Sequence, residues 1–127
     1  MLQFSPNLVA GGDIYPFRIV KMDTTAFTGV ASTAAADYVV GVTDGSTKLF
    51  SSGLHAASGD PISFQPSNCV QIEAGGNITA GLGLIASTAG VAITAAGSGN
   101  VPLFVALEAA ASGQIFWAYR LPATKAL

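Results

Sequence analysis

Residues able to support chemistry are few in this chain and stand apart from one another. The single histidine, His55, lies in the loop SSGLHAASGD, with Ser51, Ser52, Ser58 and Asp60 nearby along the chain. A Ser-His-Asp relay uses these residue types, but it joins residues that are distant in sequence, and the Gly-x-Ser-x-Gly pattern is absent. We therefore expect His55 to be a solvated loop residue and the protein not to be an enzyme.

The string GLGLIA (81–86) matches the dinucleotide fingerprint G-x-G-x-x-G with alanine in the last place. That motif presents backbone N–H groups and the start of a helix to a pyrophosphate. Here the following residues, STAGVAIT, favour turn and strand, and the next acidic residue is Glu108. We interpret GLGLIA as a strand interrupted by glycine and expect no nucleotide cofactor.

Metal ligands are not grouped in the sequence. Cys69 is the single cysteine, which excludes an internal disulfide and a site of several cysteines, so we expect it to be a small buried hydrophobic residue. The seven carboxylates are spread singly, without the D-x-D-x-D-G spacing of a calcium loop. We expect no metal and no cofactor.

The composition points to a protein that covers part of its surface with neighbours. Half of the 127 residues are hydrophobic, 9% are charged and the mean hydropathy is +0.54. The net charge is −2 and the five basic residues form no cluster, so nucleic acid is not an expected partner. Polar residues interrupt every apolar run, so we expect no membrane span. The start lacks the pattern of a signal peptide, so we expect synthesis in the cytoplasm.

Short β-branched and aromatic runs recur about every ten residues, separated by turns rich in glycine, asparagine and aspartate. This spacing predicts an all-β fold, a small antiparallel β-barrel or β-sandwich. The expected strands are residues 15–22, 37–43, 61–66, 69–74, 81–87, 90–94, 101–107 and 114–121. Alanine raises helix propensity at 30–38 and 105–113, where we expect at most one helical turn.

The two halves of the chain are similar in pattern. An offset of 65 residues places Ile19 over Leu84, Val20 over Ile85 and Val40 over Val105. The agreement has two explanations, a duplicated strand unit or a chance alignment in a chain rich in alanine, glycine and threonine.

The stretch QIFWAYRL (114–121) is the richest in aromatic residues. In a strand, Ile115, Trp117, Tyr119 and Leu121 share one face, and Phe116 and Ala118 share the other. Because both faces are apolar, we expect this strand to be covered by the core on one side and by a neighbouring subunit on the other. The alternative is a stacking platform for a sugar or a base.

The first 13 residues differ from the remainder, which we predict to be a single β domain over residues 14–127. They carry three apolar residues, Leu2, Phe4 and Leu8, around Pro6. This segment is either a flexible arm that becomes ordered on a partner or an N-terminal edge strand.

The order of YVVGVTDG, SGDPISFQ, VQIEAGGNITAG and PLFVALEAAASGQIFWAYRL resembles the capsid decoration, or cement, proteins of tailed bacteriophages over about residues 14–121. The resemblance implies a β-body that forms a homo-oligomer, more often a trimer than a dimer. It also implies a place on the outer surface of the virion, where the protein joins neighbouring major capsid protein subunits and stabilises the capsid. The expected interface residues are Leu2, Phe4, Leu8, Trp117 and Tyr119. The alternative function is a carbohydrate- or receptor-binding β-module on a virion surface.

Overall fold

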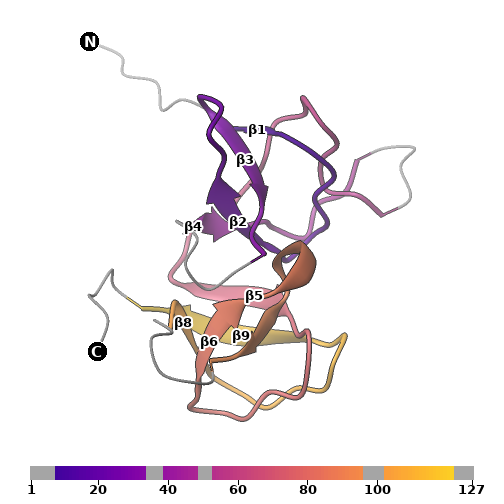
Figure 1. Cartoon of the computed structure of the whole chain (residues 1–127). Helices are drawn as coiled ribbons and strands as arrows, with labels where there is room; N and C mark the ends of the chain where they lie inside the picture. The colour runs from indigo at the N-terminus through magenta and orange to yellow at the C-terminus, as the bar shows by residue number, and fades with distance from the viewer. Residues whose placement is uncertain (1–7, 34–38, 49–52, 96–101, 122–127) are drawn as a thin grey trace.

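The computed structural model describes residues 8–33, 39–48, 53–95 and 102–121. These residues form two β-sheets, one in each half of the chain, which lie one above the other in Figure 1. The all-β class predicted from the sequence is confirmed, with the second sheet antiparallel throughout and the first antiparallel except for one strand pair.

The first sheet has the strand order β1-β3-β2-β4. Its strands are β1 (Val9–Ala10), β2 (Ile19–Met22), β3 (Thr28–Ala31) and β4 (Val39–Val42). Single ladder pairs, Val9 with Pro61 and Thr43 with Phe64, place the segment 61–64 between β1 and the end of β4. This half therefore curls around its own core.

The second sheet has the order β5-β9-β8-β6-β7. Its strands are β5 (Cys69–Glu73), β6 (Gly83–Ala86), β7 (Ala92–Thr94), β8 (Phe104–Ala106) and β9 (Ile115–Arg120), with a short 3-10 turn, η1 (Thr88–Gly90), between β6 and β7. A pair between Ala74 and Ala92 brings the end of β5 next to β7. The second half therefore curls in the same way.

The two halves repeat one strand order. In the first, Ile14 pairs with Ala56, β2 pairs with β3 and β4, and the segment 61–64 completes the unit. In the second, Ile78 pairs with Ala110, β6 pairs with β7 and β8, and β9 completes the unit. This repetition favours a duplicated strand unit, although the equivalent residues Ile14 and Ile78 are 64 residues apart rather than 65.

The core joins the halves into one body. The larger cluster of buried residues lines the inner face of the second sheet, with Phe104 and Phe116 at its centre, and it also includes Ile19 and Val42 of the first. A smaller cluster fills the first half. Because Ile19 and Val42 are inaccessible or nearly so within the larger cluster, separating the halves would expose apolar surface, which is unfavourable in water.

Polar contacts cross the same junction. The Arg18 guanidinium donates to Glu73 Oε2 at 3.0 Å and to the Ala89 carbonyl at 3.1 Å. From the second sheet, Arg120 donates to the carbonyls of Val39 and Val40. Each half thus supplies one arginine that binds the other half.

Gly90 of η1 packs against the backbone of β2 at this junction. Its φ is +82°, and a Cβ placed there would lie 2.6 Å from the Ile19 carbonyl oxygen. Both the left-handed backbone and the close approach require glycine.

The structure differs from the sequence-based strand list in two places. β3 was not expected as a strand, and the segment 61–66 forms single ladder pairs rather than a continuous strand. Of the two alanine-rich stretches, residues 30–31 belong to β3 and residues 105–106 to β8, while residues 34–38 lie outside the described residues. Gly29 explains the missed β3, because a Cβ there would meet Val20 and Ile62 at 3.0 Å or less.

The N-terminal segment is described from Leu8 onward. Val9–Ala10 is the edge strand of the first sheet, and Leu8 packs against the smaller core cluster. Leu2 and Phe4 lie outside the described residues. The division of the chain into residues 1–13 and 14–127 stays a prediction.

Candidate interaction surfaces

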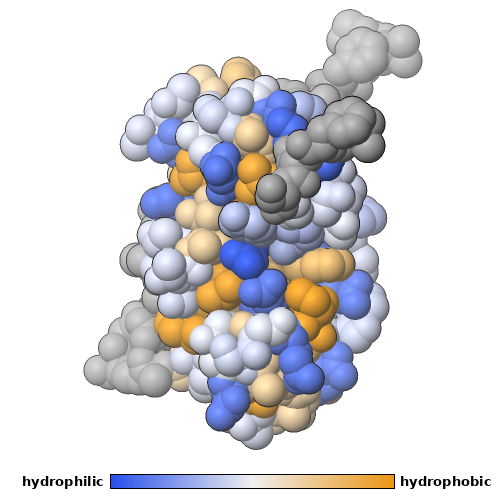
Figure 2. Space-filling view, turned by 90° about the vertical axis from the view of Figure 1, so that its right-hand side faces the viewer, coloured by the Kyte–Doolittle hydropathy of each residue, from blue (hydrophilic) through white to orange (hydrophobic). Residues whose placement is uncertain are grey.

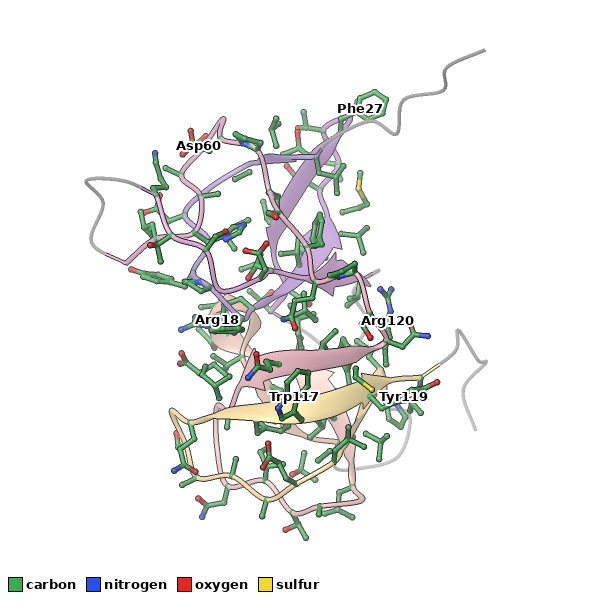
Figure 3. The ribbon with its side chains drawn as sticks, turned by 180° about the vertical axis from the view of Figure 1, so that it is seen from behind. Arg18, Phe27, Asp60, Trp117, Tyr119 and Arg120 are labelled. Carbon is green, nitrogen blue, oxygen red and sulfur yellow. The ribbon has the colours of Figure 1, made fainter. Side chains whose placement is uncertain are left out.

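The strand β9 presents Trp117 and Tyr119 outward. Phe116 and Ala118 are buried against the core, whereas Ile115, Trp117 and Tyr119 are 38%, 45% and 40% exposed. The alternation predicted for this strand is confirmed. Figure 3 shows Trp117 and Tyr119 on the lower sheet, away from the first half.

Neighbouring strands extend this apolar surface. Val105 of β8 pairs directly with Tyr119, and the Leu107 N–H donates to the Trp117 carbonyl at 3.0 Å. Leu107 is 50% exposed. We call the surface of Val105, Leu107, Ile115, Trp117 and Tyr119 the β9 face. Figure 2 shows one side of the molecule, on which hydrophobic side chains gather among polar ones around its middle and lower half.

The two carboxylates beside the β9 face already have partners. Glu73 of β5, which pairs with Ile115, accepts a hydrogen bond from Arg18. Glu108 accepts the backbone N–H of Trp117 at 2.9 Å. Gln71 lies directly across from Trp117, so one amide side chain adjoins the indole ring.

A second exposed apolar group lies at the other end of the molecule. Val9, Met22 and Phe27 lie at the same end of the first sheet, Phe27 in the β2–β3 turn and Val9 and Met22 on opposite faces of neighbouring strand ends. Phe27 is 57% exposed and has a φ of +54°, a left-handed conformation that is unfavourable for a residue with a side chain. We call these three residues the hairpin-tip surface. The sequence analysis missed it, although TTAFTG offered a signal, an aromatic residue within a polar turn.

His55 does not have the environment expected from the sequence. It is 7% exposed, so the expectation of a solvated loop histidine is wrong. Its Nε2 accepts the Ser63 backbone N–H at 3.0 Å, and its Nδ1 lies 2.9 Å from the Ser46 carbonyl oxygen. These partners require a neutral ring with the proton on Nδ1. His55 was misjudged because its partners come from two segments that fold back over it.

Asp44 completes the same network. It accepts hydrogen bonds from the backbone N–H and hydroxyl of Ser46 and from the Ser63 hydroxyl, and it lies 3.6 Å from His55 Nδ1. Partial burial acts to raise the pKa of Asp44, but the hydrogen bonds from Ser46 and Ser63 outweigh it and lower the pKa below its usual value.

This geometry does not fit a general base. A histidine that activates a serine must receive the hydroxyl proton on a free ring nitrogen, but Nε2 is occupied by the Ser63 N–H. The hydroxyls of Ser46 and Ser63 both donate to Asp44 instead. The network is therefore organised to hold the segments around residues 44–48 and 53–65 together.

Cys69 and GLGLIA also have clear places in the fold. Cys69 is exposed on the outward face of β5, so the expectation of a buried cysteine is wrong. It was misjudged because Val70 and Ile72, which alternate with it, are the buried residues of this strand. GLGLIA contains β6 and is followed by the single turn η1, as the interpretation of a strand predicts. No βαβ unit surrounds it among the described residues.

Neither a group of metal ligands nor a membrane-spanning helix occurs among the described residues. No three His, Cys, Asp or Glu side chains there come together as a metal site would require. No helix in the same part of the chain has the length and apolar character needed to cross a membrane.

The sequence matches no protein-family model and no curated protein. A solved structure does match: the head fiber gp8.5 N base of bacteriophage phi29 is similar, with a TM-score of 0.64 and 15% sequence identity. The match covers 91% of this chain and 91% of that chain. At this identity the likeness shows the fold, and it extends over both halves of the chain.

Proposed function

We propose that this chain is a structural protein of a bacteriophage virion, without catalytic activity, which binds the outer surface of an expanded capsid and joins neighbouring major capsid protein subunits. The observation that carries the proposal is the likeness of fold, over nearly the whole chain, to the base of a phage head fiber. The resemblance in motif order to decoration proteins, which was drawn from the sequence, points to the same class.

The distribution of apolar surface supports a joining role. The β9 face and the hairpin-tip surface lie in different halves, as the positions of Trp117 and Phe27 in Figure 3 show. A protein that holds several neighbours needs more than one contact surface, whereas a module for a single small ligand needs one. Joined copies would bind several capsid subunits at once, so that individually weak contacts combine into stable attachment.

Binding only the expanded shell would stabilise that shell by mass action. The test mixes the purified protein with expanded capsids that lack it and, in parallel, with unexpanded procapsids, and measures co-sedimentation against protein concentration. We expect saturable pelleting with expanded capsids and weaker pelleting with procapsids. Protein that remains in the supernatant with both shells would refute the proposal.

The second candidate function is a carbohydrate- or receptor-binding module. The observation that favours it is the exposed indole of Trp117 with the amide-bearing Gln71 directly across from it, since sugars stack on aromatic rings and bond to amides. Trp117 is the only tryptophan of the chain, so its fluorescence reports on this surface alone. Saturable quenching by host-surface glycans would support this function, and an unchanged emission would exclude it for the glycans tested.

A further inference from the structure

We propose that the β9 face is the surface through which copies of this chain associate. The inference deepens the proposed function and rests on it in one respect, the expectation that a cement protein acts as a homo-oligomer. The hairpin-tip surface then remains available for the capsid.

The two halves of the chain provide an internal comparison for the β9 face. In the first half, the Asp44 N–H donates to the Ser63 carbonyl at 3.1 Å, and the Ser63 N–H donates to His55. In the second half, the Trp117 backbone makes the matching pair of bonds. Its carbonyl accepts the Leu107 N–H, and its own N–H donates to Glu108. Ser63 and Trp117 are therefore equivalent positions.

Two residues further along each segment, Gln65 corresponds to Tyr119. The repeated unit thus forms with serine and glutamine at the positions where the second half carries tryptophan and tyrosine. The backbone bonds that these two positions share therefore form without aromatic residues, although segment 61–66 makes single ladder pairs where β9 is a continuous strand. The large exposed side chains of Trp117 and Tyr119, which are unfavourable in water, are explained by a partner that covers them.

The size of the face fits a protein partner. Full burial of a large side chain covers about 150–250 Å², so the exposed fractions of Leu107, Ile115, Trp117 and Tyr119 amount to roughly 300–400 Å² of apolar surface. A standard interface buries about 800 Å² on each partner, of which about 60% is apolar. The β9 face supplies most of that apolar share, and it extends beyond the two aromatic rings on which a sugar would stack.

The charges around the face suit a second copy in particular. The two carboxylates at its margin, Glu73 and Glu108, are already hydrogen-bonded to Arg18 and to the Trp117 N–H. Because Arg18 neutralises Glu73 and Glu108 is exposed at the margin, where solvent screens its charge, two such faces can come together without an oppositely charged partner. The apolar composition of the chain points the same way.

The test uses the residues of the first half as replacements. The double variant Trp117→Ser and Tyr119→Gln places on β9 the residues that the equivalent segment already uses. We expect light scattering to give a multiple of 12.7 kDa for the unchanged protein and a single 12.7 kDa for the double variant. Phe27→Asn, a change in the hairpin-tip surface, is the matched control and should keep the molecular mass of the unchanged protein.

Circular dichroism and a cooperative urea transition establish that each variant is folded. Because a destabilised double variant could lose its association indirectly, a second measurement uses the unchanged protein. On dilution, the emission of Trp117 should shift to longer wavelength as the mass falls, since dissociation exposes the indole to water. A monomeric unchanged protein, a folded double variant that keeps its mass, or an emission that does not follow the mass would each overturn the inference.

Capsid sedimentation separates this inference from the proposed function. If the unchanged protein is a monomer that still pellets with expanded capsids, the inference fails and the proposed function stands. If it forms oligomers through Trp117 but does not pellet, the proposed function fails and the inference stands.

Discussion

His55 and Glu108 accept equivalent backbone hydrogen bonds in the two halves of the chain. His55 Nε2 receives the N–H of Ser63, and Glu108 Oε2 receives the N–H of Trp117, at 3.0 and 2.9 Å. In each half the neighbouring strand, β4 or β8, ends before it reaches this residue. A side chain therefore supplies the acceptor for the backbone N–H. His55 and Glu108 thus have the same structural role, because each accepts a backbone N–H that has no backbone acceptor.

Replacing His55 with alanine should destabilise the fold. The Ser63 N–H would lose its acceptor at a part-buried site, and such a hydrogen bond contributes about 0.5–1.5 kcal/mol. His55→Gln, which can still accept a hydrogen bond, should lose less. Urea denaturation measures the free energy of unfolding. Glu108→Ala is the comparison, and since Glu108 is exposed its loss should be smaller. A His55→Ala protein as stable as the unchanged one would contradict the structural role.

Gly90→Ala should destabilise the junction between the halves. The change forces alanine into a left-handed backbone and places its Cβ against the Ile19 carbonyl, so we expect a loss of about 2–4 kcal/mol in the free energy of unfolding. Gly59→Ala separates the two causes, because Gly59 has a φ of +89° but open space around it. It should lose only about 1–2 kcal/mol. Equal losses in the two variants would show that close packing at Gly90 is unimportant.

The sequence predicted strands with a clear pattern of aromatic and β-branched residues. It missed β3, which is stabilised mainly by pairing with a neighbouring strand. The aromatic and β-branched pattern of QIFWAYRL predicted β9 and its two faces correctly. β3 was missed because Gly29 and Ala31 carry little strand signal, and the strand is stabilised by pairing with β2 and by the close packing of Val20 on Gly29.

For the candidate functional residues too, the sequence predicts what depends on one strand and misses what depends on contacts between distant segments. The outward position of Trp117 follows from a period of two along one strand, so it could be predicted from local sequence. The burial of His55 depends on Ser46 and Ser63, which come from separate segments, and pattern alone does not bring these together. The positive φ of Phe27 is likewise set by the hairpin in which it lies.

Acid should weaken the fold partly through Asp44. Its pKa is lowered in the folded protein from an ordinary value of 3.8, so its contribution to stability is present above that value and is lost as the pH falls through the lower folded pKa. Asp44→Asn should therefore be less stable at neutral pH and lose less stability than the unchanged protein below about pH 4. Urea denaturation at a series of pH values measures both.

Asp60 provides the control for the acid experiment. Hydrogen bonds from Lys48 and from the Ala57 N–H lower its pKa as well, but it is more exposed to solvent. Asp60→Asn should change the acid profile less than Asp44→Asn, because solvent screens its interactions. Identical acid profiles for the unchanged protein and Asp44→Asn would show that the network around His55 does not contribute to acid stability.

Phe27→Asn should separate attachment to the capsid from folding. Asparagine tolerates the left-handed backbone better than phenylalanine, so the free energy of unfolding should stay the same or rise by up to about 1 kcal/mol. Removing the exposed ring should weaken binding to expanded capsids at least tenfold, since burial of a phenylalanine contributes about 1.5–3 kcal/mol and 1.4 kcal/mol corresponds to a factor of ten. Thr24→Asn, in the same turn and exposed, is the control and should bind as the unchanged protein does. A folded Phe27→Asn protein that pellets with capsids at the same concentration as the control would remove the hairpin-tip surface from the attachment site.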